Sequence, residues 1–152
     1  KLIGSDVILG LNSVNTVLTS RGMIRHFRNC KKFYILVIKP NFGCSTKEIY
    51  SKVRKFSKKE RFNNNIVNSR KFFLNYLIQN RNDLQFIVER KNPYIKKLLA
   101  DIKNEKGCFL SRMTGSGSVC YGLFNNQVIA KRAYINLKKQ HPKLWFSLAK
   151  TV

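Results

Sequence analysis

The chain has 152 residues, of which 43% are hydrophobic, so it is long enough to fold around one substantial core. Its formal net charge of +23 attracts polyanions, yet the basic residues are scattered over nearly every segment and accompany many Asn, Ile, Phe and Tyr residues, whose codons are rich in A and T. A biased genome explains this charge better than a nucleic-acid-binding face does, and without a long apolar stretch or a signal peptide we expect part of a longer soluble protein.

Strands are predicted in the first quarter of the chain. Residues 14–28 have a short strand-like pattern that Gly22 interrupts. The continuous apolar run at 33–38 is typical of a central strand, and Pro40 ends it.

A helix is predicted next, because Ser45 and Glu48 have the spacing of a capping box. Its apolar face would carry Ile49, Val53 and Phe56. The polar, asparagine-rich segment 57–65 then predicts a flexible surface loop.

Three further helices are predicted before residue 107. Their apolar residues are Phe72, Phe73, Tyr76 and Leu77 in the first helix, Leu84, Ile87 and Val88 in the second, and Ile95, Leu98, Leu99 and Ile102 in the third. Asn82-Asp83 can cap the second helix, Asn92-Pro93 can cap the third, and Gly107 marks the exit from it.

A glycine- and hydroxyl-rich turn, Arg-Met-Thr-Gly-Ser-Gly-Ser at 112–118, lies between two strand-like runs at 108–110 and 119–124. Glycine reaches backbone dihedrals closed to other residues, so such a turn can point successive N–H groups at a phosphate. Gly-Ser clusters between strands are also common as plain tight turns. Both interpretations of the turn stay open from the residues alone.

A last helix and a last strand complete the pattern. Asn126 precedes the helix, which ends before His141-Pro142, and residues 144–150 form the strand. The apolar residues of this helix are Ile129, Ala133, Tyr134 and Leu137. The order of elements predicts an α+β fold, in which an antiparallel sheet has helices packed on one side.

The cysteines and histidines do not have the spacing of a zinc site. They are Cys30, Cys44, Cys108, Cys120, His26 and His141. No Cys-x-x-Cys pair occurs, and Cys108 and Cys120 lie in apolar strand runs, where a buried free thiol is the ordinary state. We therefore expect no metal site and a cytoplasmic, reducing environment.

Five stretches, in this order, resemble the GHMP kinase superfamily, and most closely the 4-diphosphocytidyl-2-C-methyl-D-erythritol kinases of isoprenoid precursor synthesis. They are Gly-Ser-Asp-Val at 4–7, Lys-Pro-Asn-Phe-Gly-Cys-Ser-Thr at 39–46 with Tyr50, Arg-Asn-Asp-Leu at 81–84, the turn at 112–118, and residues 145–151. The resemblance spans essentially the whole chain. It departs from the usual pattern at Ile8, where the family has proline, and at Ile24-Arg25, where Gly-Glu is common.

The resemblance implies a fold and a division into domains. Residues 29–152 would form the ferredoxin-like α+β C-terminal domain, and residues 1–28 would be the tail of the N-terminal α/β domain. The glycine-rich loop that wraps ATP would then lie upstream of the chain.

The same resemblance implies ATP-dependent phosphorylation of the 2-hydroxyl of 4-diphosphocytidyl-2-C-methyl-D-erythritol. Asp6 matches the family's proton acceptor, Thr46 a substrate-side hydroxyl, and Tyr50 the aromatic residue that stacks on cytosine. The turn residues Thr114, Gly115, Ser116, Gly117 and Ser118 match a motif beside the ATP phosphate loop. The implied co-substrate is ATP with Mg²⁺.

The expected partners are ATP and the small cytidyl substrate, with no specific nucleic acid and no membrane. Two alternatives stay open. One is a basic nucleic-acid-binding module with interleaved aromatic residues such as Phe56, Phe62 and Phe72. The other is a GHMP kinase that acts on a different small alcohol, such as mevalonate, homoserine or a sugar.

Overall fold

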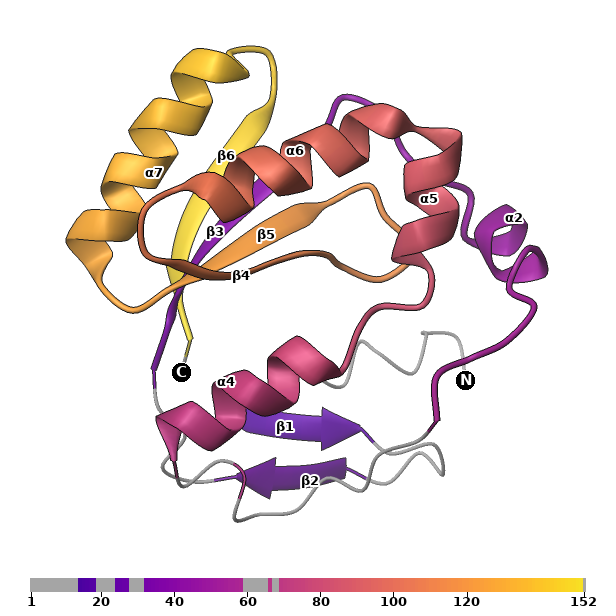
Figure 1. Cartoon of the computed structure of the whole chain (residues 1–152), viewed down its shortest axis with the longest axis horizontal. Coiled ribbons are helices and arrows are strands. Elements are labelled where there is room, and N and C mark those ends of the chain that lie inside the picture. The colour runs from indigo at the N-terminus through magenta and orange to yellow at the C-terminus, as the bar shows by residue number, and fades with distance from the viewer. Residues whose placement is uncertain (1–13, 19–23, 28–31, 59–65, 67–68, 152) are drawn as a thin grey trace.

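The computed structural model describes residues 14–18, 24–27, 32–58, 66 and 69–151, and Figure 1 shows their arrangement. The helices and strands are β1 (Asn15–Leu18), β2 (Ile24–Phe27), β3 (Tyr34–Lys39), α2 (Thr46–Ser51), α4 (Arg70–Gln79), α5 (Gln85–Lys91), α6 (Pro93–Asn104), β4 (Cys108–Met113), β5 (Cys120–Phe124), α7 (Gln127–Gln140) and β6 (Trp145–Lys150).

Four of the strands form one antiparallel sheet in the order β4-β5-β3-β6. Strand β3 is central because it pairs with β5 on one side and with β6 on the other, so that Leu36 lies opposite both Gly122 and Leu148. The connections follow the strand-helix-strand-strand-helix-strand order of a ferredoxin-like domain. This arrangement confirms the predicted α+β fold, and β1 and β2 pair separately as a two-stranded hairpin.

Helices α6 and α7 cover one face of this sheet (Figure 1). The predicted stripe of α6 is fully confirmed, since Ile95, Leu98, Leu99 and Ile102 are all buried. They pack against Leu36 and Ile38 of β3, together with Leu137 of α7. Burial of each side chain of this size contributes about 1.5–3 kcal/mol to stability.

Helix α4 covers the opposite face of the sheet. The predicted packing of helices on one side therefore describes α6 and α7, whereas α4 lies on the other side. Its Phe73, Leu74 and Leu77 pack against a second cluster of buried residues formed by Phe33, Leu110 and Leu123. Alternate residues of a strand point to opposite faces, so a β3 that is apolar throughout needs cover on both sides.

Helix α2 begins as predicted and ends earlier than predicted. The Ser45 side chain accepts from the Glu48 N–H at the N-cap, and Ile49 is buried. The helix ends at Ser51, and Phe56, which was expected on its apolar face, is 59% exposed. Beyond the helix, the backbone N–H and the hydroxyl of Ser57 both donate to Asp83.

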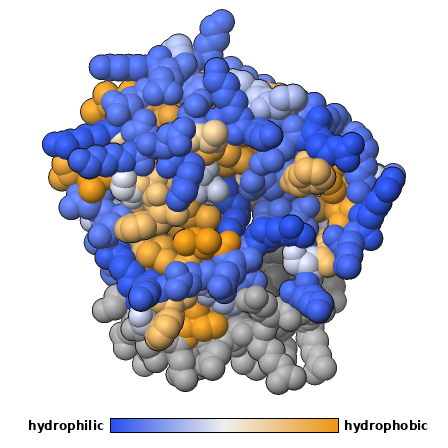
Figure 2. Space-filling view, viewed as in Figure 1, coloured by the Kyte–Doolittle hydropathy of each residue, from blue (hydrophilic) through white to orange (hydrophobic). Residues whose placement is uncertain are grey.

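Hydrophilic side chains cover most of the face shown in Figure 2, and apolar side chains gather in a hollow between α6, β4 and α4. This hollow has a volume of about 360 Å³ and is lined by Ile78, Leu99, Ala100, Lys103, Phe109, Leu110 and Ser111. Among the described helices, none is long and apolar enough to cross a membrane.

Gly122 of β5 tests the packing between the sheet and α6. A Cβ at this position would lie 2.6 Å from Cγ2 of Ile102, whereas a Cβ at Gly43 would meet nothing within 4 Å. We therefore expect Gly122→Ala to lower the free energy of unfolding by about 1–3 kcal/mol, the usual cost of overpacking a core. Urea denaturation measures this change, with Gly43→Ala as the matched control, and equal stability of the two variants would contradict the packing described.

Candidate functional site

The turn between β4 and β5 is closed by its own backbone. The Thr114 N–H donates to the Val119 carbonyl at 2.9 Å, and the Gly117 N–H donates to the Thr114 carbonyl at 3.1 Å. Gly115 and Gly117 have φ values of +53° and +94°, a region that favours glycine. Since two of its N–H groups are used in closing it, this turn fits a tight hairpin better than a phosphate cradle. Arg112 and Met113, which were assigned to the turn, belong to β4.

The turn packs against the loop that leads from β3 into α2. Ser118 is buried, and its hydroxyl donates to the Phe42 carbonyl. The hydroxyls of Ser116 and Thr46 lie 2.8 Å apart in a hydrogen bond between residues 70 positions apart in sequence. The structure therefore brings together two of the stretches that carried candidate residues.

Space around the turn is limited at Gly117. A Cβ at this residue would lie 2.8 Å from the Met113 sulfur and 3.2 Å from the Cys44 sulfur, whereas a Cβ at Gly115 would meet nothing within 4 Å. Gly117 thus permits the close approach of the turn to the loop, and Gly115 only supplies backbone conformation.

Helix α2 carries the two predicted substrate-side residues on its accessible side. Thr46 is its first residue, and Tyr50, one turn later, is 53% exposed. Positions four apart share one face of a helix, so the Thr46 hydroxyl and the Tyr50 ring can meet one ligand. Ile49, which is fully buried, anchors the other side of the helix in the core.

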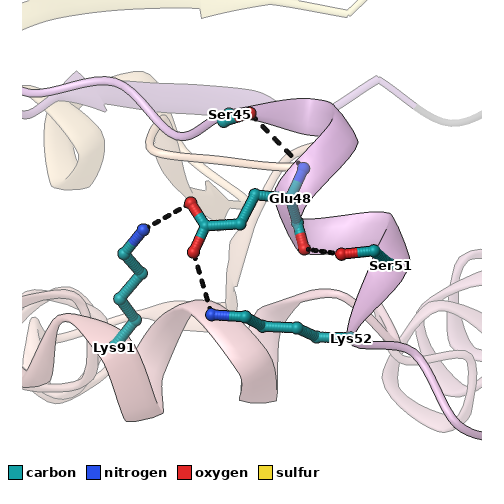
Figure 3. Close-up of polar contacts among 5 residues, drawn as sticks. All are labelled: Ser45, Glu48, Ser51, Lys52 and Lys91. Atoms are coloured by element: carbon teal, nitrogen blue, oxygen red, sulfur yellow. Dashed lines mark hydrogen bonds and ion pairs between the residues drawn. The ribbon is translucent and has the colours of Figure 1, made fainter.

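Glu48 joins α2 to the end of α5, as Figure 3 shows. Its carboxylate accepts from Lys52 Nζ at 2.8 Å and from Lys91 Nζ at 2.6 Å. These hydrogen bonds, first that of Lys52 and then that of Lys91, lower the pKa of Glu48 from its ordinary 4.5 to about 2. The Glu48 carboxylate therefore stays ionised at neutral pH and holds the ammonium groups of Lys52 and Lys91 beside α2.

The segment before α5 contacts the glycine turn. The Asn82 side-chain amide donates to the carbonyls of Met113 at 2.9 Å and Gly115 at 2.8 Å. The neighbouring Asp83 has a lowered pKa, chiefly because the Ser57 hydroxyl and backbone N–H donate to it. The Arg-Asn-Asp-Leu stretch therefore ties the turn on one side and the loop after α2 on the other.

The structure brings together some of the predicted site residues and adds others. Thr46 contacts the turn and Tyr50 lies on the same helix, whereas Asp6 lies outside the described residues. Asn82 was expected as a helix cap and as part of the family-like stretch at 81–84, with no role at the site, and Glu48 only as part of a capping box. Lys91 was not singled out, because its contact with Glu48 crosses 43 positions in sequence and no local pattern reports it.

A second hollow, of about 660 Å³, adjoins the loop before α2. It is lined by Lys39, Pro40, Asn41, Phe42, Gly43 and Trp145. The apolar hollow beside α4 is smaller, and the polar contacts described above lie elsewhere. We place the candidate site at the loop, the turn and α2, because the hydrogen bonds from distant segments converge there.

Comparison with known proteins identifies the family that this chain resembles. Residues 70–143 match the family model described as GHMP kinases C terminal. The chain is 39% identical over 150 residues to the 4-diphosphocytidyl-2-C-methyl-D-erythritol kinase of Pelagibacter ubique (strain HTCC1062), covering 99% of this chain and 52% of that protein.

Two solved structures share the fold. A crystal structure of a 4-(cytidine 5'-diphospho)-2C-methyl-D-erythritol kinase superimposes with a TM-score of 0.70 at 20% identity, covering 95% of this chain and 53% of that one. A homoserine kinase from Cytophaga hutchinsonii ATCC 33406 superimposes with a TM-score of 0.60 at 12% identity, covering 90% and 47%. The chain spans about half the length of the curated relatives it matches.

The pKa of Glu48 tests the contact between α2 and α5. Replacing Lys91 by methionine removes one of its two donors, so we expect the pKa to rise from about 2 toward 4.5. Because the pKa of the folded protein lies below the ordinary value, the contribution to stability is present above about pH 4.5 and is lost as the pH falls toward 2. An NMR titration of the carboxyl carbon measures the midpoint.

Lys97→Met, on the exposed side of α6, is the matched control, because it removes the same charge and leaves both donors of Glu48 in place. Added salt should also raise the midpoint in the unsubstituted protein, since exposed charges are screened. A midpoint near 4.5 before any substitution would contradict the contact.

Proposed function

Because the chain belongs to the GHMP kinases through their C-terminal domain, we propose that the protein containing it phosphorylates the 2-hydroxyl of 4-diphosphocytidyl-2-C-methyl-D-erythritol with ATP. The observation that carries this proposal is the hydrogen bond between Thr46 and Ser116. It joins the helix that matches the family's cytidyl side to the turn that matches its ATP side. The likeness to the Pelagibacter kinase extends over 99% of the chain, so it includes both segments.

The proposed roles follow from what each group can do. Asp6 takes the proton of the attacking hydroxyl, because transfer to an alcohol needs a base beside the nucleophile. Tyr50 offers its exposed ring to the cytosine, and Thr46 offers a hydroxyl on the same face of α2. The residues 114–118 form a wall that keeps Thr46 in place.

ATP is the proposed co-substrate, and Mg²⁺ would neutralise its phosphates during transfer. Among the described residues, no three His, Cys, Asp or Glu side chains gather into a metal-ligating group. Mg²⁺ commonly takes most of its ligands from nucleotide phosphates and water, so no residue of this chain is assigned to hold it. The free thiols of Cys44, Cys108 and Cys120 favour a cytoplasmic protein.

We also propose the division into residues 1–28, as the tail of a preceding domain, and residues 29–152. In support, β1 and β2 pair only with each other among the described strands, whereas β3 to β6 form one sheet.

An assay of phosphoryl transfer by the complete protein tests the proposed function. We expect ATP-dependent phosphorylation of the cytidyl substrate, with homoserine and mevalonate as poor acceptors. Preferential phosphorylation of homoserine would favour another GHMP kinase activity. Saturable binding of random oligonucleotides at physiological salt, without phosphorylation, would instead support the nucleic-acid-binding alternative.

Asp6→Asn in the complete protein tests the proposed base. The amide cannot accept the proton, so we expect kcat to fall by at least about 100-fold while the affinity for the cytidyl substrate changes little. Steady-state kinetics and equilibrium binding measure the two effects. Asp101→Asn is the matched control, because Asp101 contacts His141 on the α6 side of the domain. Near-normal turnover of Asp6→Asn would exclude this role.

Tyr50→Ala tests the stacking on cytosine. Loss of the ring should weaken cytidine diphosphate binding by about 1–3 kcal/mol, because base–aromatic stacking has this magnitude. Isothermal titration measures the affinity, and Tyr50→Phe, which keeps the ring, should bind almost normally. ATP affinity should be preserved in both variants, and an unchanged cytidine affinity in Tyr50→Ala would refute the assignment.

A further inference from the structure

The segment formed by Asn82 and helix α5 contacts both the β4–β5 turn and helix α2. At its start, Asn82 donates to two carbonyls of the β4–β5 turn. At its end, Lys91 donates to Glu48 of α2 at 2.6 Å. The two elements that it holds meet each other at the Ser116–Thr46 hydrogen bond. The contacts therefore form a closed triangle of turn, α2 and α5.

The Asn82 side chain is half-buried, and both its Nδ2 group and its Oδ1 atom have hydrogen-bond partners. Both acceptors of the Nδ2 group are backbone carbonyls, of Met113 and Gly115, and Oδ1 accepts from the Leu84 N–H at 3.0 Å. A side chain held by three hydrogen bonds to backbone has little rotational freedom. The Asn82 side chain can thus fix the positions of the Met113 and Gly115 carbonyls.

The same segment makes a second contact with Met113, the last residue of β4. The Gln85 Oε1 accepts from the Met113 N–H at 3.0 Å, while Asn82 binds the Met113 carbonyl. Gln85 contacts Met113 of the strand and Glu89 of its own helix, whereas Asn82 also contacts Gly115, inside the turn. Of these two residues, Asn82 is the one that holds the turn directly.

We propose that Asn82 is a positioning residue of the kinase site. Resting on the proposed function, this role is to hold the turn so that Ser116 stays within hydrogen-bond distance of Thr46. Asn82 acts through the turn and needs no contact with substrate or ATP. Small displacements of groups that orient a substrate cost about 100-fold in rate, so an unsupported turn would impair the reaction without unfolding the domain.

Asn82→Asp in the complete protein is the sharpest test. The carboxylate keeps the acceptor for the Leu84 N–H and loses both donors to the turn. We expect kcat/KM for the cytidyl substrate to fall by about 10- to 100-fold. Asn136→Asp is the matched control: it introduces the same charge and loses a hydrogen bond to Glu105, on the α7 side of the domain, and activity should be retained.

A double-mutant cycle with Ser116→Ala separates positioning from a purely structural effect. If Asn82 acts through Ser116, the double variant should lose less activity than the product of the two single losses. Multiplicative losses, or normal kinetics of Asn82→Asp, would overturn the proposal. If Asn82→Asp does not fold, Asn82→Ala removes the donors without adding charge. The same cycle with Ser116→Ala then tests whether Asn82 acts through Ser116.

Amide hydrogen exchange keeps this proposal separate from the proposed function. The Gly117 N–H, bonded to Thr114, should lose protection in Asn82→Asp, while amides of β3 such as Leu36 keep theirs. Unchanged protection of Gly117 would overturn the positioning role even if the enzyme is a kinase. A wild-type protein that phosphorylates no cytidyl substrate would refute the proposed function, whereas the exchange result would still decide whether Asn82 holds the turn.

Discussion

The register between β3 and β5 is the constraint on which the rest of the structure depends. Ile38, next to the last residue of β3, pairs with Cys120, the first residue of β5. Because the strands are antiparallel, the loop after β3 and the turn before β5 must lie at the same end of the two strands. A slip of one residue would turn Leu36 and Ile38 away from α6, so burial fixes this register.

The same strand explains the layers around it. Side chains of β3 alternate between the cluster under α6 and α7 and the cluster under α4, so both faces must be covered. Local signals were sufficient for α6, with Pro93 in its first turn, and for α7, where the Asn126 side chain accepts from Val128. The face covered by α4 could not be predicted, because an apolar stripe does not say which side of a sheet it meets.

The sequence indicates the individual segments of the candidate site but not the hydrogen bonds that join them. Thr46, Tyr50 and the glycine turn were identified by a resemblance that depends on local motifs. Their convergence comes from hydrogen bonds between distant segments, such as that between Asn82 and Gly115. The contact of Ser57, beyond α2, with Asp83 is of the same kind. Local patterns carry no information about such contacts.

We propose that α2 and the turn face the same ligand. Assigned amide resonances of the complete protein, followed while cytidine diphosphate is added, show whether they do. We expect the resonances of Thr46, Tyr50 and Ser116 to shift together in one saturable transition. Shifts gathered instead around Lys39 and Trp145, in the neighbouring hollow, with Ser116 unaffected, would contradict it.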